Sequence, residues 1–144
     1  MKMSKKEYKN YAEKKADKSP MVKDMFNAFW IGGLICTIGQ FFVSLYMNLG
    51  MDKEMSGTAS SITLVFISAA LTGLNVYDKI AKVAGAGTLV PITGFANAVV
   101  SPALEFKNEG FIMGVAANMF KIAGPVITYG IIASVFAGII YLFV

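Results

Sequence analysis

Neutral hydrogen-bonding side chains recur inside the long uncharged runs of this 144-residue chain. Two sets have helical spacing, so each shares one helix face: Thr37, Gln40, Ser44 and Asn48 in the first run, and Ser68, Thr72 and Asn75 in the second. These two stripes either hydrogen-bond to each other and hold the bundle together, or line a polar path for a solute, and the spacing leaves both open. A neutral hydrogen bond contributes only about 0.5–1.5 kcal/mol, so such a path would hold a polar solute weakly.

Acid–base, metal and nucleophilic chemistry is not expected from these residue types. The sequence has no His and no Arg, and Cys36 is its single cysteine. The uncharged runs hold no convergent acid and base, so we expect no enzyme, no catalytic residue, no metal site and no cofactor. Without Arg, an anion could be held only by Lys, by helix N-termini or by neutral donors.

The stretch from 83 to 104 is apolar enough for a membrane but contains residues that an ordinary helix avoids. It carries no charge and includes Gly87, Pro91 and Gly94. Non-helical backbone at membrane depth persists only where it packs in protein or lines a water-filled cavity. The candidate path-lining or solute-binding residues are therefore Gln40, Ser44, Thr72, Asn75, Gly87, Pro91, Gly94 and Asn97.

The elements that must position these residues are membrane helices. Hydrophobic residues make up 56% of the chain and charged residues 15%. This predicts an all-α integral membrane protein, a small bundle of three to four transmembrane helices with a Gly/Pro-broken or re-entrant segment. We expect a basic cytoplasmic tail over 1–27 and a membrane domain over 28–144, with spans at about 28–49, 59–77 and 122–144, the broken segment at 83–104 and a short helix at 110–120.

Charge is concentrated in the N-terminal tail. Residues 1–27 hold eight Lys and four acids, and the whole chain has a net charge of +4. Such a tail beside a first span is typical of the cytoplasmic side and favours a membrane surface over nucleic acid as its partner. Four further charges bracket the broken segment and are expected as interfacial caps: Asp78, Lys82, Glu105 and Lys121.

Two topologies are compatible with the sequence. If 83–104 enters the membrane and returns, the chain spans three times and its C-terminus lies outside. If that segment crosses, there are four spans and the C-terminus lies inside. Pro91 and the neighbouring glycines, at the place where a turn would fall, favour re-entry.

The last apolar run carries small residues at every fourth position. Gly130, Ser134 and Gly138 form a stripe that lets another helix approach closely. That helix could belong to the same chain or to another subunit. Because a bundle of this size is too thin to enclose a wide pore, conduction would favour a homo- or hetero-oligomer.

Several long stretches resemble the stage V sporulation protein AC family, part of the SpoVA membrane proteins of endospore-forming bacteria. The most specific are LTGLNVYDKI (71–80) and GAGTLVPITGFAN (85–97), and the resemblance extends over nearly everything from about residue 26 onward. The related AE-b type shares this membrane core, but the long basic tail favours the AC type.

The resemblance implies a membrane protein of the forespore and the spore inner membrane. It implies a channel or transport subunit, working with other SpoVA-type subunits, that takes up calcium–dipicolinic acid in sporulation and releases it in germination. It also implies a response to membrane tension. The alternative is a structural scaffold of the same assembly without a conduction path of its own.

We predict that the N-terminus is cytoplasmic in the cell that makes the protein, because eight Lys lie in the tail and only Lys53 in the next loop. In a Cys36→Ser background, Lys5→Cys should be protected from an impermeant thiol reagent in intact cells, and Lys53→Cys should react. The reverse pattern would overturn the assignment.

Overall fold

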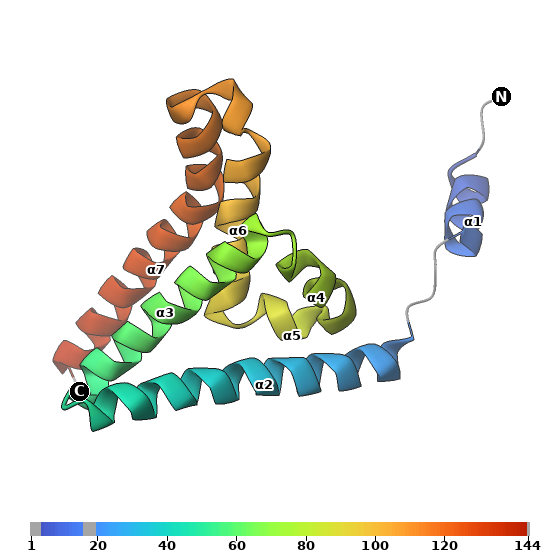
Figure 1. Ribbon diagram of the computed structural model, residues 1–144. Coiled ribbons are helices and arrows are strands. Elements are labelled where there is room, and N and C mark those ends of the chain that lie inside the picture. Colours follow the sequence, from blue (N-terminus) through green and yellow to red (C-terminus); the bar gives the residue numbers. More distant parts are fainter. Residues whose placement is uncertain (1–3, 16–19, 144) are drawn as a thin grey trace.

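The computed structural model describes residues 4–15 and 20–143, and within these ranges every regular element is a helix (Figure 1). Three helical stretches are long and apolar enough to cross a membrane. The expected all-α membrane fold is therefore confirmed. In chain order the elements are α1 (Lys5–Lys15), α2 (Met21–Asn48), α3 (Lys53–Gly73), α4 (Tyr77–Ala84), α5 (Ala86–Leu89), α6 (Ile92–Glu105), the 3₁₀ helix η1 (Lys107–Glu109), the π-helix η2 (Phe111–Ala116) and α7 (Ala117–Phe143).

The described part of the basic tail forms α1, which begins with a capping box. The Ser4 N–H donates to Glu7 Oε2 at 2.9 Å, and the Glu7 N–H donates to Ser4 Oγ at 3.3 Å. The backbone and side-chain hydrogen bonds from Ser4 hold the pKa of the Glu7 carboxyl below its usual value. The tail positions 1–3 and 16–19 lie outside the described residues.

A tight turn joins α2 to α3 and makes them a helical hairpin. Gly50 adopts a φ of +94°, and the Met51 N–H reaches back to Tyr46 O at 3.2 Å, which ends α2 in a Schellman motif. Asp52 then caps α3, because its Oδ1 accepts from the Met55 N–H at 2.9 Å.

The α3 and α6 helices lie side by side and run in the same direction. Ser68 Oγ donates to Thr93 O, and Thr72 Oγ1 lies 2.8 Å from Asn97 Oδ1. A step of four residues along α3 thus matches a step of four along α6. Because consecutive parallel helices require the chain to travel back between them, α4 and α5 form the return (Figure 1).

The return segment is placed against the N-terminal half of α2. Gly87 of α5 is buried and lies so close to Ala28 that a Cβ at position 87 would be 2.9 Å from the Ala28 Cα. The same added Cβ would overlap the Ala28 carbonyl oxygen. In Figure 1, α4 and α5 accordingly fill the open end of the angle between α2 and α3.

The C-terminal helix differs from the sequence expectation. A break at Lys121 was expected between a short helix over 110–120 and a span over 122–144, but the helical stretch Phe111–Phe143 continues through it. Lys is a good helix former, and its Nζ donates to Asn118 Oδ1 at 2.7 Å, so it ends an apolar run without ending the helix. Pro125 also lies inside α7.

The first helix also extends beyond the expected span. A start near Ala28 was expected from the end of the charged tail, but α2 begins at Met21, directly after Pro20. Pro restricts the preceding backbone and lacks an N–H, so it marks the helix start better than the last charge does.

Gly94→Ala should destabilise the bundle, because a Cβ at position 94 would be 2.6 Å from Leu89 O and 2.8 Å from the Leu89 Cα. Overpacking of this kind typically costs about 1–3 kcal/mol. The measurement is the free energy of unfolding in mixed micelles. The matched control is Gly124→Ala, where the added Cβ meets nothing within 4 Å. Equal stability of the two variants would contradict the close approach.

Candidate functional site

The interior of this protein is more polar than its surface. Of the residues that the structure describes, the buried polar ones are Ser56, Ser60, Ser68, Thr72, Thr88, Thr93 and Asn118, whereas the buried hydrophobic ones are Tyr77, Ala84 and Ala96. Most large aliphatic and aromatic side chains on the three long helices face outward. This is the arrangement expected when the surroundings are hydrocarbon, because helices in lipid associate through small residues and hydrogen bonds.

One part of this polar interior joins α3 to α6. Ser68 Oγ donates to Thr93 O at 2.6 Å. Thr72 Oγ1 lies 2.8 Å from Ser68 O and 2.8 Å from the side-chain oxygen of Asn97. Thr72 and Asn97, two candidate path residues, are therefore brought together, but each faces the other.

The second part supports the broken segment. Tyr77 OH, at the start of α4, donates to Thr88 O at 2.9 Å and lies 3.1 Å from Thr93 Oγ1. Thr88 Oγ1 donates to Gly85 O at 3.0 Å. Gly85 directly precedes α5 and Thr88 lies within it, so side-chain hydroxyls donate to carbonyls at the place where the regular helical hydrogen bonding is interrupted. We call Ser68, Thr72, Tyr77, Thr88, Thr93 and Asn97 the hydroxyl network.

Tyr77, Thr88 and Thr93 were not singled out from the sequence. The signal available was their position, since Thr88 and Thr93 flank Pro91 on either side and Tyr77 begins the helix that leads into the break. Wherever a membrane helix is broken, nearby hydroxyl side chains are the natural donors to the freed carbonyls.

The first polar stripe lies elsewhere. Gln40 and Ser44 are on an exposed face of α2, where Gln40 Nε2 lies 3.5 Å from Ser44 Oγ. The α2–α3 contact uses other groups: Ser60 Oγ donates to Gly39 O at 3.0 Å, and the Tyr46 and Thr63 hydroxyls are 2.7 Å apart. The interpretation that the two stripes hydrogen-bond to each other is therefore wrong. The α3 stripe bonds to α6, and the α2 stripe bonds to no other helix among the described residues.

Asn75 has a backbone role. Its φ of 56° is the one positive value at a non-glycine residue in the described ranges. The Asn75 N–H donates to Thr72 O at 3.0 Å and the Val76 N–H donates to Leu71 O at 2.9 Å, which is a Schellman motif. Asn tolerates the left-handed conformation better than most residues, so this position ends α3.

The three backbone-breaking residues meet at α5. Gly87 and Gly94 permit close contacts with α2 and with the end of α5. Pro91 is the N-cap residue of α6, with a ψ of 161°. Gly87 and Pro91 also line a cavity of about 410 Å³ beside Gly32 and Cys36 of α2. The wall of that cavity is almost wholly apolar.

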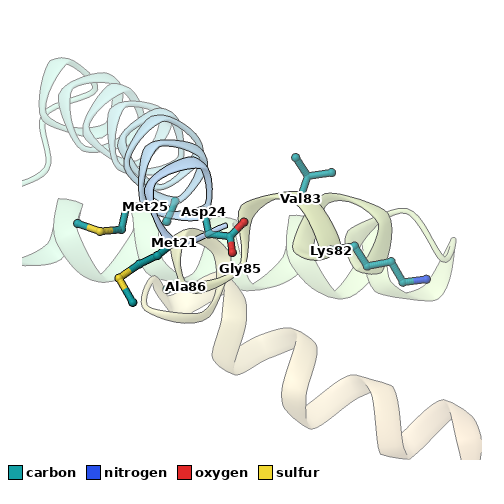
Figure 2. Close-up of a pocket in the computed structure, with 8 residues that line it drawn as sticks. Met21, Asp24, Met25, Lys82, Val83, Gly85 and Ala86 are labelled. Atoms are coloured by element: carbon teal, nitrogen blue, oxygen red, sulfur yellow. The ribbon is translucent and has the colours of Figure 1, made fainter. Parts of the chain in front are cut away.

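The four bracketing charges are all exposed: Asp78, Lys82, Glu105 and Lys121. Lys82 lines a second cavity of about 380 Å³, together with Asp24 and Met25 of α2 (Figure 2). In Figure 2 the Asp24 carboxylate lies near Gly85, and the Lys82 side chain extends away from it. No group of three or more His, Cys, Asp or Glu that could hold a metal ion occurs in the described ranges.

The small-residue stripe of α7 lies against no other helix in the part of the chain that the structure describes. Added Cβ atoms at Gly130 and Gly138 meet no atom within 4 Å. Ser134 Oγ donates at 2.8 Å to Gly130 O of the same helix. Of the two alternatives left open by the sequence, packing inside the chain is therefore not the one observed.

Three apolar helices, a polar interior and a broken segment held by hydroxyl groups define a small helical membrane protein. Residues 24–140 match the SpoVAC/SpoVAEB sporulation membrane protein family, and the chain belongs to this family. It is similar to "Stage V sporulation protein AC" of Bacillus subtilis (strain 168), with 45% identity over 137 residues, 94% of this chain and 91% of that protein. The resemblance identified from the sequence is thus confirmed. No solved structure matches this chain.

Tyr77→Phe should destabilise the bundle by about 1–3 kcal/mol, the usual effect of leaving a buried carbonyl without its donor. The variant removes the hydroxyl that donates to Thr88 O and keeps the ring. Unfolding in mixed micelles measures the effect. Tyr129→Phe, on a side chain that is 73% exposed, is the matched control. No difference between the two variants would mean that the hydroxyl network does not hold the broken segment.

Proposed function

We propose that this protein is a membrane channel or transport subunit for calcium–dipicolinic acid, in uptake during sporulation and in release during germination. We place it in the forespore membrane and the spore inner membrane, in an oligomer with other SpoVA-type subunits. Membership of a sporulation membrane protein family supports this assignment, as does the similarity to a relative named for stage V of sporulation. Nothing in the family description or in the site favours an enzyme.

The observation that carries the proposal is the parallel pairing of α3 and α6. Ser68 bonds to Thr93 and Thr72 to Asn97, so α6 must start inside the bundle, beside α3. Thr93 lies beside Ser68, which is five residues before Gly73, the last residue of α3. If Gly73 lies near the membrane surface, Thr93 is therefore at a depth of about 7.5 Å (five times 1.5 Å). We therefore favour the re-entrant topology, with α2, α3 and α7 as spans and the C-terminus outside.

A conduction path in this proposal lies between subunits. Within one chain the hydroxyl network is closed, because its side chains bond to one another and to nearby carbonyls. Gln40 and Ser44, by contrast, are exposed on the apolar part of α2, where most of the other exposed side chains are aliphatic or aromatic. A polar stripe facing hydrocarbon is unfavourable, so we assign it to a shared, water-filled path. The exposed small-residue stripe of α7 suits close packing against a neighbouring helix.

The solute fits a path of neutral groups. Dipicolinate carries two carboxylates, which one Ca²⁺ balances, so the chelate has no formal net charge. Neutral amides and hydroxyls can exchange hydrogen bonds with it without the strong binding that fixed charges would give. At about 0.5–1.5 kcal/mol for each hydrogen bond, the cargo is released readily.

A scaffold subunit without its own path is the second candidate. The closed hydroxyl network favours it, because Thr72 and Asn97 contribute to helix packing. The two candidates differ at Gln40 and Ser44, which no other helix of the chain contacts through a hydrogen bond in the described ranges.

Liposomes that hold only this protein should release trapped calcium–dipicolinate, more strongly under hypo-osmotic stress. Gln40→Leu with Ser44→Leu should slow release at least tenfold at equal protein level, because the double variant removes the polar face of α2. Thr128→Leu is the control, since its hydroxyl donates only to Gly124 O of its own helix. Release at the original rate would mean that Gln40 and Ser44 do not line a path and only pack against another helix. No release from the unmodified protein would favour the scaffold.

A further inference from the structure

A cavity of about 200 Å³ lies between α2 and α3, at the end where α4 and α5 hold them apart (Figure 1). Its walls are aliphatic: Ile31, Ile35 and Ile38 come from α2, and Leu64, Ile67 and Leu71 come from α3. This volume exceeds the roughly 150 Å³ apolar cavity that stays free of water and takes up benzene. The cavity is therefore large enough for a hydrocarbon ligand.

The polar residues at its base offer nothing to a polar ligand. Ser68, Tyr77 and Thr88 line the cavity, but each of their hydroxyls donates to a protein carbonyl. Thr93 Oγ1 is likewise within 3.1 Å of Tyr77 OH. The surface that the cavity presents is consequently apolar, although the hydroxyl network lies directly behind it.

The medium outside the cavity is hydrocarbon. Both walls belong to helices that are long and apolar enough to span a membrane, and the lining residues lie in the middle of α2 and in the C-terminal half of α3. An apolar cavity open to lipid is filled by an acyl chain at little cost, whereas water would find no hydrogen-bond partners there.

The α4 helix supplies a polar end for such a ligand. Ile80 lines the cavity, while Lys79 and Lys82 are exposed on the other side of the same helix. Both lysines follow shortly after the end of α3, on the side of the proposed inner surface, and Lys82 lines the neighbouring 380 Å³ cavity together with Asp24 of α2. Lysines at this level pair with lipid phosphate.

We propose that this cavity is a binding site for one acyl chain of an inner-leaflet phospholipid, whose phosphate lies near Lys79 and Lys82. The chain fills the space between α2 and α3 and packs against Ile35 and Leu71. The site is independent of whether the protein conducts a solute.

Native mass spectrometry of the full-length protein, extracted from bilayers of phosphatidylethanolamine and phosphatidylglycerol, tests the site. We expect one phospholipid retained for each chain. Ile35→Phe and Leu71→Phe fill the cavity and should reduce that retention at least tenfold. Leu45→Phe, on an exposed face of α2 away from the cavity, should leave it unchanged. Equal lipid retention in all variants would overturn the proposal. A changed oligomeric mass without loss of lipid would also overturn it, and would indicate that a helix of another subunit occupies the cavity.

A second measurement covers the case in which the filling variants fail to fold. Ile67→Cys in a Cys36→Ser background places a thiol in the cavity wall. Its reaction with an apolar maleimide should be fast after detergent removes lipid and at least fivefold slower after phosphatidylglycerol is added back. Lys79→Gln with Lys82→Gln should weaken this protection. Reaction rates that do not depend on added lipid would refute an acyl-chain site.

Discussion

The structure depends on one constraint, that a broken helix in hydrocarbon must find hydrogen-bond partners inside the protein. Water, which would satisfy such groups elsewhere, is absent at this depth. The chain meets this constraint with hydroxyl side chains. Tyr77 donates to Thr88 O, Thr88 to Gly85 O and Ser68 to Thr93 O, so hydroxyl groups pair with carbonyls in α5, just before it and at the start of α6. The position of α6, the angle between α2 and α3, and the three cavities lined by α4 or α5 follow from where that broken segment is held.

The same constraint explains why the interior is polar and the surface apolar. In water, a domain would bury its aliphatic side chains. Here the lipid is as apolar as Leu or Ile, so burying aliphatic side chains adds little stability. Small hydroxyl residues and glycine therefore occupy the contacts between helices. Gly87 against Ala28 and Gly94 against the end of α5 are two examples. Among the described residues, such packing leaves most of α7 and one face of α2 without a partner, which is the physical reason for proposing a path and subunit contacts there.

Two lateral features of α2 give it different roles along its length. Its Ile31–Ile38 face borders the cavity that we assign to an acyl chain. Its Gln40 and Ser44 face is polar and exposed. A lipid chain between α2 and α3 would make the angle between these helices depend on the membrane, and that angle positions the polar stripe. This gives a physical route by which membrane tension could reach a path lined by α2.

The sequence by itself determined that the protein lies in a membrane, that its fold is all-α and where its helices are broken. Uncharged runs predicted the membrane helices, and Gly87, Pro91 and Gly94 predicted the broken segment, because these features depend on residue type and local backbone freedom. The tertiary structure decided which polar groups meet. It paired Thr72 with Asn97, left Gln40 exposed, gave Asn75 a capping role and carried α7 through Lys121. Those outcomes depend on the direction in which the chain returns beside α3, and local spacing carries no information about that direction.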